Sequence, residues 1–207
     1  MNENNFSRRR LMQLLSATMV GSLFSSKLKA GTSFTHSFNL DNSDNPKPVF
    51  IPPGGGEKGK FGDNDLTFKL DKSQTSGNLG SSEIILYPGY LGAPPHHHKN
   101  FDEICIVQEG TVHILVGEEV FEVPAGGWHL RPRGIMHTFW NRGTTPAKFI
   151  ELYSPGGHEA YMKDLAKLFE DGKRPKPGEL AKLADIHDIV FEFDKLQWIM
   201  DKYKVHL

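Results

Sequence analysis

Residues 94–103 read PPHHHKNFDE, and this stretch places three histidines and a glutamate close together in the chain. His96 and His98 are two residues apart, so on an extended strand both imidazoles point to the same face. Glu103 follows five residues after His98, and on a straight strand it would face the opposite way. A bend at Lys99 and Asn100, where asparagine tolerates turn geometry, would bring Glu103 beside the two histidines.

A second stretch supplies a fourth donor. Residues 126–141 read GGWHLRPRGIMHTFWN, in which a Pro–Gly turn leads into His137. Three imidazoles and one carboxylate that converge inside a barrel would suit a borderline divalent metal. Three neutral donors and one anion leave positions open on an octahedral ion, and catalysis requires open positions. We therefore predict a metal site formed by His96, His98, Glu103 and His137.

The chain around these stretches breaks into short β-prone runs separated by turn residues. Regular spacing of such runs is typical of an antiparallel sandwich or barrel. The expected strands are 66–70, 83–87, 103–107, 111–116, 120–123, 127–130, 136–140 and 149–153, with a further short strand at 49–51. Apolar residues at helical spacing predict helices at 159–169 and 179–189, which we expect to cover one edge of the barrel. The predicted fold class is all-β with C-terminal helices.

The two stretches resemble the two motifs of the cupin family. The first motif, His-x-His, four residues, Glu, six residues and Gly, is matched by His96, His98, Glu103 and Gly110. Its leading glycine has only off-spacing candidates, Gly89 and Gly92. The second motif, Gly-x5-Pro-x-Gly-x2-His-x3-Asn, is matched without a gap by Gly126, Pro132, Gly134, His137 and Asn141. The resemblance covers residues from about 49 to 193 and implies a jelly-roll-like cupin β-barrel.

The segments at 52–54, 61–62 and 155–157 further resemble single-barrel cupins of the quercetinase-like branch. This likeness implies that His96, His98, Glu103 and His137 bind iron, manganese, nickel, cobalt or copper. A flavonol-type substrate would coordinate the metal through a hydroxyl oxygen. Glu103 would be a ligand, a hydrogen-bond partner or the base that takes the substrate's proton.

The resemblance therefore implies an oxygen-dependent dioxygenase of a small hydroxylated, aromatic substrate. Two alternatives stay open. One is another metal-cupin enzyme, such as an oxalate-type decarboxylase or an isomerase. The other is a non-catalytic protein that captures a small molecule in the same pocket.

The N-terminus resembles a twin-arginine export signal. Arg8, Arg9 and Arg10 directly precede a moderately apolar segment, and small residues follow, with a cleavage point expected after Ala30. We therefore expect a periplasmic or secreted protein. The expected organisation is an export signal at 1–30, an arm or linker at 31–65, the cupin barrel at 66–155 and a helical extension at 156–207.

Composition narrows the class of partner. The 207 residues carry a net charge of −1, and removal of residues 1–30 would leave −5. An acidic protein lacks the basic face that nucleic acid requires.

The single cysteine, Cys105, excludes an intrachain disulfide, and we expect it to be a small buried core residue. No apolar run reaches the roughly 18 residues of a membrane span. Apolar residues on both faces of 103–107 indicate that the outer face is covered by the arm, the helices or a second subunit, which favours a homodimer.

The other histidines, arginines and aromatic residues near the motifs are expected to have structural roles. His97 alternates away from the proposed ligands and should lie on the surface. Solvated or packed positions are expected for His113, His129 and His158, and surface positions for Arg131 and Arg133. Two roles, the floor of an aromatic pocket or ordinary core packing, stay open for Trp128, Phe139 and Trp140.

Overall fold

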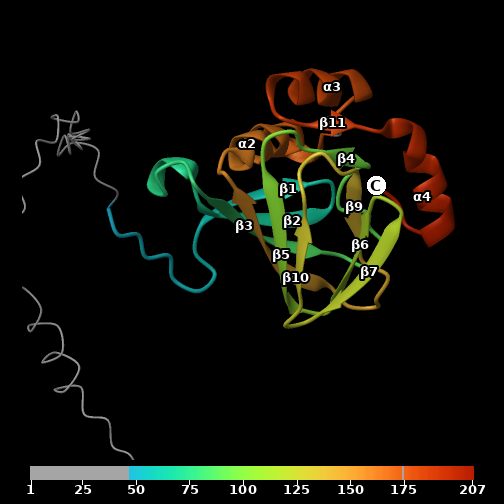
Figure 1. Ribbon diagram of the computed structural model, residues 1–207, viewed down its shortest axis with the longest axis horizontal. Helices are drawn as coiled ribbons and strands as arrows, with labels where there is room; N and C mark the ends of the chain where they lie inside the picture. The colour runs from blue at the N-terminus through green and yellow to red at the C-terminus, as the bar shows by residue number, and fades with distance from the viewer. Residues whose placement is uncertain (1–46, 174) are drawn as a thin grey trace, which may run out of the picture. The chain divides into compact units, whose positions relative to one another are not determined.

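The computed structural model describes residues 47–173 and 175–207, and the proposed export signal lies outside them. Two antiparallel sheets form the described domain (Figure 1), with strand orders β1-β2-β3-β10-β5-β8 and β11-β4-β9-β6-β7. The strands are β1 (Glu57–Phe61), β2 (Asn64–Leu70), β3 (Gly80–Leu86), β4 (His96–His97), β5 (Asp102–Glu109), β6 (Thr111–Val116), β7 (Glu119–Pro124), β8 (Trp128–Arg131), β9 (His137–Trp140), β10 (Ala147–Ser154) and β11 (Val190–Phe191). The helices are α2 (His158–Leu168), α3 (Pro177–Ile186) and α4 (Leu196–Tyr203). This is the all-β barrel with C-terminal helices that the sequence predicts.

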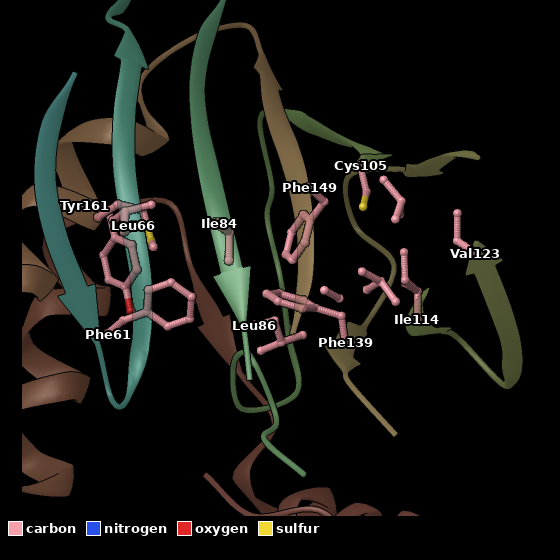
Figure 2. Packing of buried hydrophobic residues seen from close by; sticks show 14 of the residues in the cluster. Phe61, Leu66, Ile84, Leu86, Cys105, Ile114, Val123, Phe139, Phe149 and Tyr161 are labelled. Carbon is pink, nitrogen blue, oxygen red and sulfur yellow. The ribbon is translucent and has the colours of Figure 1, made fainter. Parts of the chain in front are cut away.

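The core lies between the inner faces of the two sheets. Figure 2 shows Ile84 and Phe149 of the larger sheet near Phe139 and Ile114 of the smaller one. Phe139 and Phe149 meet edge to face, with ring centroids 5.6 Å apart. Cys105 is fully buried in the same cluster, and burial raises the pKa of its thiol, so it is the core residue that the sequence predicts.

Helix α4 covers part of the outer face of the smaller sheet. Leu115 and Trp140 point outward from β6 and β9 and pack against Ile199 of α4 in a second apolar cluster. Trp140 also stacks on Tyr203, with ring centroids 4.3 Å apart. Strands β6 and β9 therefore carry apolar residues on both faces because α4, a helix that the sequence did not predict, covers the outer face.

The remaining differences lie at the ends of the domain. Residues 49–51 form no strand, whereas β1 forms within the segment expected to be an arm. Helix α3 begins at Pro177, because proline is well suited to the first turn, and it ends three residues before the expected position. Among the described residues, no helix is both long and apolar enough to cross a membrane.

Candidate metal centre

The four predicted donors come together at one end of the barrel interior. His96 lies on β4, His98 directly follows it, Glu103 is the second residue of β5, and His137 begins β9. One ligand atom from each of these residues lies within 4.8 Å of the others, and all four residues are buried. The Nε2 atoms of His98 and His137 are 3.6 and 3.0 Å from the Glu103 carboxylate oxygens. The cluster could hold a metal ion.

The bend that the sequence requires after His98 is present and is held by a distant residue. The backbone N–H groups of Lys99 and Asn100 donate to Asp188 Oδ2 at 3.0 and 2.6 Å. Gly134 also donates its N–H to the carbonyl of His98 at 2.6 Å, with a φ of 77° that favours glycine. These contacts turn the chain so that Glu103, the second residue of β5, faces inward.

Backbone carbonyls fix the tautomer of each proposed ligand histidine. The Nδ1 atoms of His96, His98 and His137 lie 2.7, 2.9 and 3.0 Å from the carbonyl oxygens of Pro94, Asp188 and Ile135. A carbonyl only accepts, so each Nδ1 must carry a proton, and in the neutral form of each ring Nε2 is the atom that keeps a lone pair. Hydrogen bonds of this kind orient metal-bound histidines and raise their basicity.

The Nε2 lone pairs that face into the cluster receive no hydrogen bond from the protein. His98 Nε2 and His137 Nε2 are buried and have no hydrogen-bond partner, and the Glu103 carboxylate faces both of them. Burial lowers the pKa of His96 and His137, which keeps both rings neutral near pH 7. Buried acceptors without a partner destabilise a protein by about 1–3 kcal/mol each. A cation among them would satisfy all of these atoms at once, so the residues fit a divalent metal.

The C-terminal segment supports the ligand strand. Strand β11 pairs with β4, so that Phe191 lies opposite His96 and Val190 lies opposite His97. Asp188, two residues before β11, binds His98 Nδ1 through its carbonyl and the following bend through its carboxylate. Sequence reasoning missed this contribution, because a two-residue strand has no detectable alternation.

Arg131 lies directly beneath the cluster, and the prediction that it lies on the surface is wrong. Its side chain is fully buried, its Nη1 lies 3.2 Å from Glu103 Oε2, and its Nη2 pairs with Glu151. The register explains its position, because Arg131 is opposite Glu103 on the neighbouring strand and shares its inward direction. The signal in the sequence was Glu151, a second inward carboxylate that requires a buried cation.

The charges of this group determine the state of Glu103. Burial opposes ionisation, but the Arg131 guanidinium holds the pKa of Glu103 well below its ordinary value. Burial raises the pKa of Glu151 to about 8, Arg131 opposes this shift, and the Glu103 carboxylate adds to it. Glu103 is therefore the ionised carboxylate of the pair and the anionic ligand available to a cation.

Three other residues that the sequence analysis considered lie outside the four-donor cluster. His97 faces outward as predicted, with Nδ1 3.5 Å from Glu192 Oε1. Trp128 is 67% exposed and belongs neither to the core nor to the cavity beside the cluster. His158 is packed, but its Nε2 lies 3.7 Å from Glu103 Oε1, beside the cluster and on a helix expected only to pack.

A cavity of ≈ 240 Å³ opens beside the cluster, with His96 and Glu103 on its wall. Of the three aromatic residues left open by the sequence, only Phe139 lines it. Most other lining side chains are apolar and come from both sheets and the C-terminal helices, including Phe61, Ile84, Leu91, Met162, Leu165 and Phe169. None of the described lining residues is lysine or arginine.

Residues 82–153 match the cupin domain family. The matched segment runs from β3 to β10 and contains all four clustered donors. This segment of the chain is therefore a cupin domain. No curated protein matches the chain.

Three solved structures are similar to part of this chain. KdgF from a Halomonas species is 18% identical over 54% of this chain and 99% of its own, with a TM-score of 0.48. A predicted oxalate decarboxylase from Thermotoga maritima is 16% identical over 52% of this chain and 99% of its own, with a TM-score of 0.49. An RmlC-like cupin from Shewanella frigidimarina is 18% identical over 55% of this chain and 96% of its own, with a TM-score of 0.46.

Proposed function

We propose that this cupin is a metal-dependent enzyme, an oxygen-dependent dioxygenase of a small hydroxylated aromatic compound. The observation that carries the proposal is the set of buried Nε2 lone pairs and one ionised carboxylate that share no proton. His96, His98, Glu103 and His137 would hold one divalent transition metal, of which iron, manganese, nickel, cobalt and copper are the candidates. When bound, the metal would orient a substrate oxygen and stabilise the negative charge left by its proton.

The surrounding residues would position the substrate and exclude water. Phe139 and the apolar side chains from α2 enclose the cavity, which strengthens the electrostatic interactions inside it. Arg131 reduces the basicity of Glu103, which favours its role as ligand and hydrogen-bond partner over its role as base.

The lining argues against the alternative substrates of a metal cupin. Oxalate and sugar phosphates are small dianions, and recognition of such ions relies on arginine or lysine. The cavity wall beside the metal cluster offers neither among the described residues, and Asp63 and Glu151 add two carboxyl groups to that of Glu103. An apolar cavity with one metal-facing wall favours a hydroxylated aromatic compound.

Oxygen uptake tests this proposal. The full chain is loaded with each candidate metal in turn and given quercetin or catechol in an oxygen-electrode cell. We expect consumption of oxygen with at least one metal, and loss of at least 90% of the rate in the His98→Ala variant. His97→Ala, which removes the neighbouring outward-facing ring, is the matched control and should keep the rate. Binding of these compounds without oxygen uptake with any metal would contradict the dioxygenase and favour a capture protein.

We also propose that the chain is exported. The support is the order of Arg8, Arg9 and Arg10, an apolar segment and small residues up to Ala30. Fractionation of bacterial cells that express the full chain should place it in the periplasm, with a shortened N-terminus. Replacement of Arg8 and Arg9 by lysine should retain it in the cytoplasm, and equal export of that variant would contradict the twin-arginine route.

A second copy of the chain is the proposed partner of the outer face of the larger sheet. Trp128 and Leu130, at 67% and 53% exposed, lie on edge strand β8 beside outward-facing Ile104 and Ile106 of β5. Edge strands with apolar neighbours invite pairing, and a two-fold arrangement would bury both patches together. Light scattering should give a dimer for the chain and a monomer for Trp128→Ser/Leu130→Ser, whereas a monomeric wild type would contradict the proposal.

A further inference from the structure

Helix α2 carries two polar rings that face the cavity. His158 and Tyr161 are three residues apart on the helix, and their rings stack with centroids 5.3 Å apart and an interplanar angle of 23°. They are only 7% and 5% exposed, and both residues line the cavity beside the metal cluster. Figure 2 shows the hydroxyl group of Tyr161 next to Phe61, another lining residue.

Neither ring is satisfied by the described part of the chain. The Tyr161 hydroxyl makes no hydrogen bond there, and burial alone raises its pKa, so it stays protonated and able to donate. The imidazole of His158 makes no hydrogen bond within these residues either. The nearest carboxylate oxygen, Oε1 of Glu103, is 3.7 Å from His158 Nε2, beyond hydrogen-bond distance.

Packing alone does not explain these two residue types. Both rings sit among aromatic side chains, where phenylalanine would fill the same space without a polar atom. The polar atoms of His158 and Tyr161 are not among the sealed buried atoms that lack a partner, because they face the cavity, where a polar group could reach them. The partner must come from within the cavity, because the cavity is the space that both residues line.

We propose that His158 and Tyr161 form a substrate-recognition pair that binds a second polar group of the substrate, apart from the group at the metal. The inference rests on the proposed function, since it places the first polar group at the metal. The cavity of ≈ 240 Å³ is smaller than the pockets of roughly 300–1,000 Å³ that hold drug-sized ligands. The substrate class is therefore a compact molecule of one or two rings with oxygen groups at two separate places.

The test compares two probes on the full chain loaded with zinc, which binds ligands without redox turnover. Catechol has adjacent hydroxyls for the metal and no second group, whereas 4-nitrocatechol adds an acceptor on the far side of the ring. Dissociation constants are measured by isothermal titration calorimetry for wild type, His158→Phe and Tyr161→Phe. Both substitutions keep an aromatic ring and remove hydrogen-bonding groups. Tyr203→Phe, on α4 and outside the residues that line the cavity, is the matched control.

We expect Tyr161→Phe to weaken 4-nitrocatechol binding about five-fold, the effect of losing one hydrogen bond of about 1 kcal/mol. Catechol binding, zinc stoichiometry and the control variant should change less than two-fold. Equal 4-nitrocatechol affinities in wild type, His158→Phe and Tyr161→Phe would overturn the recognition pair, and so would equal weakening of both probes. Zinc binding without any binding of 4-nitrocatechol would overturn the substrate class. Failure of the wild type to bind zinc would instead refute the metal site, and with it the proposed function.

Discussion

Replacement of Arg131 by methionine should strongly destabilise the metal-free protein, because it leaves two buried carboxyl groups without their cation. The arginine side chain is 0% exposed, and its Nη1 lies 3.2 Å from Glu103 Oε2. Two unit charges at that separation attract each other by about 5 kcal/mol at an effective dielectric constant of about 20. Part of this attraction offsets the desolvation of the guanidinium. Removal of one partner of a buried pair typically costs about 3–5 kcal/mol, because an uncompensated charge remains.

Urea unfolding, followed by tryptophan fluorescence at pH 7.5 with a chelator present, measures this loss. Arg133→Met is the matched control, because Arg133 pairs with Asp102 at 2.9 Å but its side chain is 45% exposed. An exposed pair contributes at most about 1 kcal/mol. Adding Glu151→Leu to Arg131→Met should restore part of the stability, since a buried carboxyl group that has lost its hydrogen-bond partner is removed. Equal losses for the two arginine variants, or a loss below about 1 kcal/mol for Arg131→Met, would refute the buried charge arrangement.

Three other features of the domain lead to predictions of their own. Hydrogen bonds from Arg133 hold the pKa of Asp102 at about 2, below its ordinary value of 3.8, so the stabilisation is complete above pH 4 and is lost as pH falls through 2. Asp102→Asn should therefore cost about 1 kcal/mol at pH 7 and converge with wild type between pH 4 and pH 2 in urea titrations, whereas a constant difference would contradict the pairing. A Cβ at Gly92 would lie 1.9 Å from Phe139 Cε2, so Gly92→Ala should destabilise the domain by about 1–3 kcal/mol, against little change for Gly178→Ala, which has open space. A divalent metal at 100 times its dissociation constant should stabilise wild type by about 2.7 kcal/mol in the same unfolding assay and leave His98→Ala unchanged.

The fold and the four clustered donors could be predicted because their signals are local. Alternating apolar residues, turn residues and the two spaced motifs predict that His96, His98, Glu103 and His137 share one site, and the structure brings them together from β4, β5 and β9. The bend after His98 could also be predicted, because the opposite parity of Glu103 demands it. Each of these inferences needs only a few residues of sequence.

The supports of the site could not be predicted because they depend on distant pairing. Arg131 faces inward only because of its register opposite Glu103, and Asp188 reaches the bend from the C-terminal segment. Helix α2 was expected only to pack, since its spacing gives no sign that His158 and Tyr161 face a cavity. The sequence allows Trp128 to lie in the core or in a pocket, yet it is exposed, because β8 is an edge strand whose outer face no described element covers.

Metal content is the most direct test of the central claim that four side chains bind a single ion. Wild type, His97→Ala, His98→Ala and Glu103→Ala are dialysed against the same divalent metal, and the bound metal is counted by elemental analysis. The geometry predicts one ion per chain for wild type and for His97→Ala, and less than one ion in ten chains for the other two variants. Equal metal content in His97→Ala and His98→Ala would contradict it.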